Sequence, residues 1–453
     1  MTHSPSPWQR LRQESRVSFT LALPIAVGQL ASMAMSVVDS LLAGRHGPIT
    51  LAAVAVGSAV WSLAMLICIG LMMAIPPTVS QLNGAGRRSE IGPIWRQALW
   101  LAAAVGLLLL GFLRWSPQLL VWMRIAAEVQ APAGEFLRAV SWGAPGLALF
   151  FATRYLSEGL SWTQPTLVFG IAALLLLIPV GYALLFGFGP IPAFGAAGLG
   201  YATALVMWLE FIAFVLYLHR SAHFRDLGLL SRFEWPDFAA IGQLLKLGIP
   251  MGIAIFMEGS LFVATALFIG RLGAVDVAAH QIALNVASAL FMIPLGVALA
   301  TTVRVGHAVG AGDVSAVRWA MRAGLALVLV TQTVSALLLV FGGGLIGRWY
   351  TDDAAIAGLA ATLMVYAAIF QYPDGIQALS GGALRGLKDT TVPAIITVFA
   401  YWAVGLSAGV YLGLHLGLRA PGFWLGLTAG LGVASLLLYL RFRRAVRKLE
   451  ATL

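Results

Sequence analysis

Twelve long apolar runs restrict what this chain can fold into. A helix that crosses the hydrocarbon core of a bilayer needs about 20 mainly apolar residues. The chain is 60% hydrophobic and only 10% charged, whereas soluble domains carry about 25% charged residues. We therefore exclude a soluble globule and predict an all-α integral membrane protein with twelve transmembrane helices. The runs lie near 18–43, 50–77, 95–114, 135–158, 164–188, 195–219, 246–270, 278–303, 320–341, 355–381, 390–413 and 420–441.

A polar stretch divides the runs into two sets of six. It predicts an N-terminal lobe at 1–219, a cytoplasmic linker at 220–245 and a C-terminal lobe at 246–453. The net charge of +10 lies in short basic clusters between the runs, where Lys and Arg set topology. Their distribution predicts that both termini are cytoplasmic, and it gives no reason to expect nucleic-acid binding. The single cysteine, Cys68, excludes an intramolecular disulfide.

An internal repeat relates the two halves. A shift of 226 residues aligns proline, glycine and arginine positions in loops and helices, which apolar bias does not produce. Because each copy holds an even number of runs, both copies have the same orientation, so the repeat is parallel. We expect two six-helix lobes that face a central cleft. Examples are Pro24 with Pro250, Gly44-Arg45 with Gly270-Arg271, and Gly84-Ala85-Gly86 with Gly310-Ala311-Gly312.

Three acidic residues lie within the apolar runs: Asp39, Glu258 and Asp374. An ionised carboxylate at mid-span costs about 2.5–3.5 kcal/mol, so such residues are candidates for function, or else belong to static hydrogen-bond networks. Two nearby acids can share a proton or hold a cation. Glu258 and Asp374 are therefore candidate ion-coupling residues, and a metal site if the ion is Na⁺. The repeat places Ser32 opposite Glu258, so each half has its own acid chemistry.

Aromatic residues and prolines lie near the acids in the sequence. Aromatic faces attract cations, so Phe256, Phe262, Phe370 and Tyr372 are candidates for binding lipophilic cations, although most rings in such spans serve packing. Prolines within helices remove a backbone donor, and they act either as hinges or as fixed kinks. The candidate hinges are Pro24, Pro250 and Pro373.

Two further acids, Glu158 and Glu210, lie in the first half. Arg154 and Glu158 are one helical turn apart, a spacing at which they could pair with each other at the inner end of a span. Glu210 is either structural or accessory.

Several kinds of chemistry have no signature in the chain. No glycine-rich loop precedes a lysine, so ATP is not expected as the energy source. Nucleophile and metal motifs are also missing from the sequence. We predict that the protein is not an enzyme and needs no cofactor.

The chain resembles the multidrug and toxic compound extrusion (MATE) family, specifically its NorM-like bacterial branch. The resemblance implies two six-helix bundles, export of cationic drugs or dyes in exchange for inward Na⁺ or H⁺, and ion or substrate roles for Asp39, Glu258 and Asp374. It also implies that Asp352 and Asp353 contact substrate. The residues that carry it are LPIAVGQL, VVDSLLAGRHGPITLAAVAVG, GIPMGIAIFMEGSLF, GRLGAVDVAAHQIALNV and PDGIQALSGGALRGLKDTTVP.

On this basis we expect a monomer in the bacterial cytoplasmic (inner) membrane, with membrane lipid as its surroundings. A flippase for lipid-linked oligosaccharides shares this architecture and is the main competing hypothesis, but it should place basic residues in the cleft. A channel would pass ionic current, and a membrane enzyme would need a reactive cluster that the sequence does not show.

Overall fold

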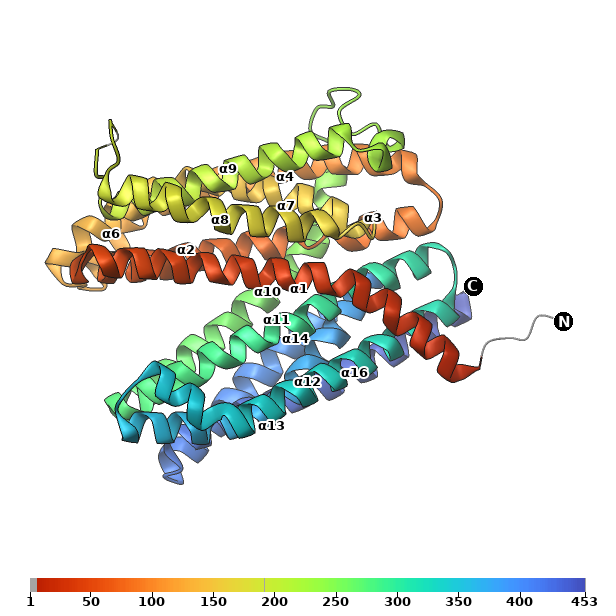
Figure 1. The fold of residues 1–453 in the computed structure, drawn as a ribbon. Coiled ribbons are helices and arrows are strands. Elements are labelled where there is room, and N and C mark those ends of the chain that lie inside the picture. The colour runs from red at the N-terminus through yellow and green to blue at the C-terminus, as the bar shows by residue number, and fades with distance from the viewer. Residues whose placement is uncertain (1–5, 191, 453) are drawn as a thin grey trace. The chain divides into compact units, whose positions relative to one another are not determined.

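The computed structural model describes residues 6–190 and 192–452, and within these ranges the chain is helical apart from turns and loops (Figure 1). Eleven of the described helices or continuous helix pairs are long and apolar enough to cross a membrane, and a bent pair, α6 and α7, which meet at 43°, accounts for a twelfth. The predicted all-α membrane fold is confirmed.

The elements of the first half are α1 (Pro7–His46), α2 (Pro48–Met72), α3 (Ile75–Gly84), η1 (Arg88–Glu90), α4 (Ile91–Trp115), α5 (Pro117–Trp122), α6 (Ala127–Ser141), α7 (Gly143–Gly159), α8 (Gln164–Phe186), α9 (Ala196–Arg220) and η2 (Ala222–Leu227). Those of the second half are α10 (Phe238–Gly270), α11 (Ala274–Gly310), α12 (Val314–Tyr350), α13 (Ala354–Gly386), α14 (Thr391–Val398), η3 (Phe399–Leu406), α15 (Ser407–Val410), η4 (Tyr411–His415) and α16 (Arg419–Thr452).

Helix ends follow local sequence signals, and the repeat uses the same signals twice. Gly86 and Gly312 are repeat partners, and both adopt left-handed backbone angles, with φ of 72° and 70°. Glycine has no Cβ and adopts this region without strain. The residue after Gly312, Asp313, caps α12 by accepting a hydrogen bond from the Ala316 backbone N–H at 2.8 Å. The same tight turn is thus built in both halves.

The chain divides into two compact units. One unit comprises residues 1–27 and 253–453, and the other comprises residues 28–252. The division falls within two helices, since α1 changes unit after Val27 and α10 after Gly252. The two points are 225 residues apart, within one residue of the repeat shift of 226. The predicted lobes, 1–219 and 246–453, are divided at the polar stretch of the sequence rather than by packing, and their bounds stay a prediction.

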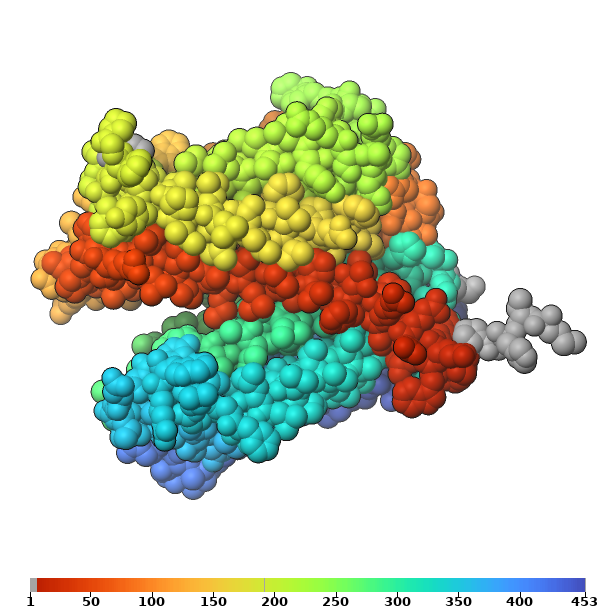
Figure 2. Space-filling view, viewed as in Figure 1, coloured from red at the N-terminus to blue at the C-terminus, as the bar shows by residue number. Residues whose placement is uncertain are grey.

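In the unit of residues 28–252, α2, α4, α6, α7, α8 and α9 pack through small residues. A Cβ on Gly200 of α9 would lie 2.7 Å from the Phe136 carbonyl oxygen of α6, so these helices approach at backbone distance. Figure 2 shows the side chains of α8 and α9, in yellow and lime, closing over one face of this unit.

In the other unit, α13 lies beside α11, α12 and α16 (Figure 1). Its core contains Phe370, Tyr401, Phe423 and Trp424, each at most 3% exposed. Phe370, one turn before Asp374 on α13, is therefore part of this core.

One backbone approach occurs twice, at positions related by the repeat. A Cβ on Gly70 would lie 2.2 Å from the Cα of Gly252. At the corresponding place in the other unit, a Cβ on Gly296 would lie 2.9 Å from the Ala22 carbonyl oxygen and 2.8 Å from the Ala26 Cβ. Gly70 and Gly296 are repeat partners, separated by 226 residues, and so are Ala26 and Gly252. The repeat thus conserves helix packing as well as sequence.

We predict that Gly70→Ala destabilises the protein by about 1–3 kcal/mol, because the added methyl group meets backbone atoms that have no flexible end to move. Gly344→Ala in α12 is the matched control, since a Cβ there meets no atom within 4 Å. Thermal unfolding in detergent, followed by tryptophan fluorescence, measures both. Equal midpoints for Gly70→Ala and the unsubstituted protein would contradict the packing.

Candidate functional site

Two of the three predicted acids lie in the same unit. Glu258 lies on α10 and Asp374 on α13, where Asp374 is 5% exposed. The two carboxyl groups are close enough for their charges to interact. The charge of Arg385, three helical turns beyond Asp374 on α13, also acts on Glu258. The structure therefore brings this predicted pair together and adds a cation that sequence reasoning did not include in the site.

Tyr401 is a third oxygen donor beside the acids. Its side chain is completely buried, and both Glu258 and Asp374 act on it electrostatically. Its hydroxyl has no hydrogen-bond partner among the described residues. A buried polar group without a partner is costly in an apolar environment, so Tyr401 is a functional candidate.

The backbone around Tyr401 is unusual. The predicted run at 390–413 is a helix that changes from α-helical to π-helical at η3 and again at η4. Short π-helical segments are rare and frequently occur at functional sites. Trp402, also in η3, donates a hydrogen bond from Nε1 to the Met257 carbonyl oxygen at 3.2 Å. Because Met257 precedes Glu258, this bond fixes η3 against the helix that carries the acid.

Aromatic rings gather around Phe370 on the helix that carries Asp374. Phe370, one turn before Asp374, contacts Phe262 of α10 edge-on at 6.2 Å between ring centroids and Trp424 of α16 at 5.4 Å. The ring of His280 on α11 meets Trp424 at 5.9 Å. Both ring nitrogens of His280 are buried without partners among the described residues. The predicted rings Phe262 and Phe370 are thus together.

The other predicted substrate residues lie elsewhere. Phe256 is 38% exposed on α10. Tyr372 lies about 200° around α13 from Phe370 and Asp374, and its hydroxyl shares a hydrogen bond with Thr333 at 3.0 Å. Asp353 caps α13 by accepting hydrogen bonds from the Ala355 and Ile356 backbone N–H groups, and Asp352 is exposed beside it. Their substrate roles stay predictions.

The third acid, Asp39, belongs to the other unit. It is 8% exposed on α1, and Thr203 of α9 donates a hydrogen bond to its Oδ2 at 3.4 Å. Its Oδ1 has no partner among the described residues. A role in ion coupling stays a prediction.

The expected Arg154–Glu158 pair is confirmed. Arg154 Nε lies 2.7 Å from Glu158 Oε1, and both side chains are at most 4% exposed. Arg154 also donates to Gln29, and Glu158 accepts from Thr166. The charge of Glu210 acts on Arg154. This buried cation is therefore neutralised by its own network.

The predicted hinges all lie inside helices that continue through them. Pro24 is within α1, Pro250 within α10 and Pro373 within α13. Pro24 and Pro250 each lie three residues or fewer before the point where their helix passes from one compact unit to the other. This placement suits a hinge, and movement there stays a prediction.

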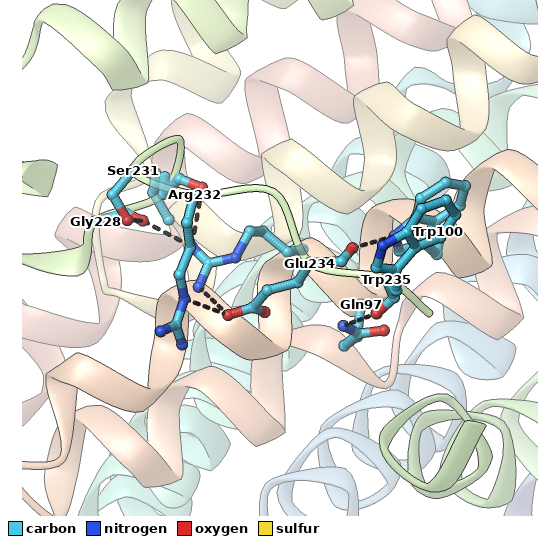
Figure 3. A network of polar contacts seen from close by, with 9 residues as sticks. Gln97, Trp100, Gly228, Ser231, Arg232, Glu234 and Trp235 are labelled. Carbon is cyan, nitrogen blue, oxygen red and sulfur yellow. Dashed lines mark hydrogen bonds and ion pairs between the residues drawn. The ribbon is translucent and has the colours of Figure 1, made fainter. Parts of the chain in front are cut away.

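The polar linker is attached to α4 (Figure 3). Arg96, 8% exposed, donates hydrogen bonds to the Gly228 and Leu229 carbonyl oxygens at 2.7 and 3.1 Å and to Glu234 Oε1 at 2.8 Å. Gln97 and Trp100 donate to the backbone carbonyls of Trp235 and Glu234. The Arg96 hydrogen bond holds the pKa of Glu234 below its usual value, so this attachment weakens as pH falls through that lowered pKa.

We predict that Arg96→Gln loosens the linker by about 1–3 kcal/mol, because it leaves several acceptors without their donor. Arg232→Gln is the control: Arg232 contacts the same Glu234 oxygen, but its side chain is 68% exposed, and exposed pairs contribute about 0–1 kcal/mol. Limited proteolysis should cut residues 228–237 faster in Arg96→Gln only. Equal cleavage rates in the two variants would refute the attachment.

The two acids and Tyr401 offer oxygen ligands. Carboxylates and a hydroxyl suit a hard cation, and the same carboxylates can carry protons. No group of three or more His, Cys, Asp and Glu side chains in the described part of the chain is arranged to hold a metal ion. Glu258, Asp374 and Tyr401 would hold Na⁺, and Glu258 and Asp374 alone would hold a proton.

Two six-span repeats and an acid pair within one unit, of which Asp374 is buried and Glu258 half-buried, define the class: a polytopic membrane protein with ionisable groups inside its spans. Comparisons with known proteins define the family. The MatE family model matches residues 24–183 and again 250–410, once in each half. The chain belongs to this family, and the predicted repeat is thereby supported.

Relatives match over nearly the whole chain. The chain is 51% identical over 448 residues to the "Probable multidrug resistance protein NorM" of Xanthomonas campestris pv. campestris, which covers 99% of this chain and 98% of the relative. It is 42% identical to the "Multidrug resistance protein PmpM" of Pseudomonas aeruginosa, over 97% of this chain and 93% of the relative. The resemblance to the NorM-like branch is confirmed.

The fold agrees with solved structures. The eukaryotic MATE transporter AtDTX14 superposes with a TM-score of 0.88 over 98% of this chain and 99% of its own, at 20% identity. An outward-facing multidrug resistance MATE transporter superposes with a TM-score of 0.87 at 19% identity, over 98% and 99% of the two chains. These similarities show the fold.

Sequence reasoning found the acids and missed Tyr401, Arg385 and His280. A tyrosine within an apolar run gives no signal, since most such rings serve packing. The histidine in the run AVDVAAHQIAL was the clearest available signal, because a lone imidazole within a span is an expensive polar group.

We predict that Tyr401→Phe leaves stability unchanged or slightly raised, because the lost hydroxyl has no partner among the described residues, while ion-dependent activity falls several-fold. Tyr411→Phe in the same span is the control, since Tyr411 is 57% exposed. Thermal unfolding and ion-dependent transport in vesicles measure the two effects. A Tyr401→Phe variant with normal ion dependence would remove the hydroxyl from the site.

Proposed function

We propose that this protein is a secondary active multidrug efflux antiporter, which exports lipophilic organic cations in exchange for inward Na⁺ or H⁺. The observation that carries the proposal is the group formed by half-buried Glu258 with buried Asp374 and Tyr401, where Phe370, one turn before Asp374, contacts Phe262. The names of the NorM and PmpM relatives support the substrate class. The protein spans the bacterial inner membrane many times, with both termini in the cytoplasm, and works as a monomer surrounded by membrane lipid.

The acid pair couples the two movements by electrostatics. Two carboxylates held close together repel each other when both are ionised, so the pair favours a bound cation or a shared proton. An arriving Na⁺ or H⁺ neutralises the pair and lowers its attraction for an organic cation. Release of the ion to the cytoplasm restores the negative charge and the affinity for the next cation.

The membrane potential supplies energy for this exchange. An inward charge gains about 2.3 kcal/mol per 100 mV, so one or two ions drive substantial accumulation outside. Pro24, Pro250 and Pro373 are proposed hinges for the alternation between inward and outward access. Asp39 and Thr203 form a separate polar site, to which we assign an accessory ion role.

The charges inside the units argue against a flippase. A carrier of lipid-linked pyrophosphate needs unneutralised basic groups, whereas Arg154, the most deeply buried arginine, is paired with Glu158. In the other unit, Arg385 acts on Glu258, but two acids against this one cation give the pair the sign that suits cations.

We predict that Glu258→Gln and Asp374→Asn each reduce ethidium efflux from proteoliposomes to the rate of protein-free vesicles, because an amide cannot exchange a charge. Separate Na⁺ and proton gradients identify the coupling ion. Glu128→Gln, an exposed acid in the first turn of α6, is the matched control and should transport normally. Normal efflux by either acid variant at equal abundance would exclude that residue, and efflux under neither gradient would refute the antiporter.

A further inference from the structure

The last turns of α16 concentrate positive charge that the protein itself does not neutralise. Arg441 is paired with Asp389 at 2.6 Å. Arg443, Arg444, Arg447 and Lys448 are exposed, and none of them contacts an acidic side chain within the described chain. Like charges on adjacent helical turns repel each other, so this helix end is complementary to an anion.

Some of these cations converge on a pocket between α16 and the start of α12, which we call the Arg447 pocket. It has a volume of about 310 Å³ and no acidic residue in its lining. One of its arginines, Arg318, is paired with Glu450, which lies outside the lining. The lining residues are Arg318, Met321, Arg322, Tyr439, Phe442, Arg443, Val446 and Arg447.

The pocket continues outward into apolar surface. Leu436, Leu440, Arg443 and Arg447 follow the spacing of one helix face, and Leu436 and Leu440 are 58% and 38% exposed. On α12, Leu329 and Val330 are 40% and 63% exposed, about two turns beyond Arg322. The two helices therefore present exposed aliphatic side chains next to a cluster of arginines.

Topology alone does not account for this arrangement. Retention of a loop in the cytoplasm requires basic residues near the span, whatever their arrangement in space. It does not require four arginines and the Tyr439 side chain to line one concave site. Basic pockets between transmembrane helices on the cytoplasmic side suit lipid phosphates.

We propose that the Arg447 pocket binds the phosphate headgroup of an anionic phospholipid, whose acyl chains lie along Leu436 and Leu440. Arg443 and Arg447 contact the phosphate, and the Tyr439 hydroxyl donates a hydrogen bond to it. The cytoplasmic leaflet as the source of the lipid rests on the membrane orientation proposed above. A free phosphate ion shares the headgroup chemistry but gains nothing from the leucines.

The test is lipid-dependent thermal stability of the purified protein in a neutral detergent. The protein is titrated separately with dioctanoyl phosphatidylglycerol, dioctanoyl phosphatidylcholine and inorganic phosphate. We expect phosphatidylglycerol alone to raise the unfolding midpoint. Arg443→Gln/Arg447→Gln should weaken the apparent affinity on the order of 10- to 30-fold, from the loss of two cations near the membrane surface.

A matched double variant separates the pocket from general charge. Arg220→Gln/Arg225→Gln removes two exposed cations outside the pocket and should keep the wild-type response. The midpoint without lipid shows whether each variant is folded, and the single variant Arg447→Gln serves if the double variant is not. Equal losses in both double variants, no loss in the pocket variant, or an equal response to inorganic phosphate would each overturn the proposal. This experiment measures no transport, so its result does not depend on whether the proposed antiport activity is confirmed.

Discussion

An ionised group inside hydrocarbon must find a partner within the protein, and this constraint governs both compact units. Arg154 satisfies it with Glu158 and Gln29, so its charge is neutralised where it lies. The pair Glu258 and Asp374 satisfies it only in part, because two acids cannot neutralise each other. The first arrangement stabilises a fold, and the second requires an exchangeable cation or proton.

The repeat gives the two units the same backbone packing, although their buried charges differ. The close approach of Gly70 to Gly252 has its counterpart at Gly296 and Ala26, and the turn at Gly86 is repeated at Gly312. These are backbone features, which depend on small residues and left-handed angles. The acids lie where the copies differ, so the two halves share packing and have separate chemistry.

Charge outside the spans has its own organisation. Arg96 fastens the linker to α4 through backbone carbonyls and Glu234. Arg443 and Arg447 at the end of α16 have no such partners inside the described chain, and they line a pocket beside exposed leucines. Basic residues of the same sequence type thus serve attachment in one place and offer a binding surface in the other.

The sequence by itself determined the helical membrane class, the twelve spans, the repeat and the Arg154–Glu158 pair. These follow from run length, spacing and local periodicity, which act over a few residues or at a fixed shift. Only the tertiary structure decided that the charges of Glu258 and Asp374 act on Tyr401, that Trp402 bonds to Met257, and that Arg318 and Arg447 share a pocket. Those last two contacts join residues separated by more than 100 positions, and an aromatic or basic residue in a run carries no sign of which helix will lie opposite it.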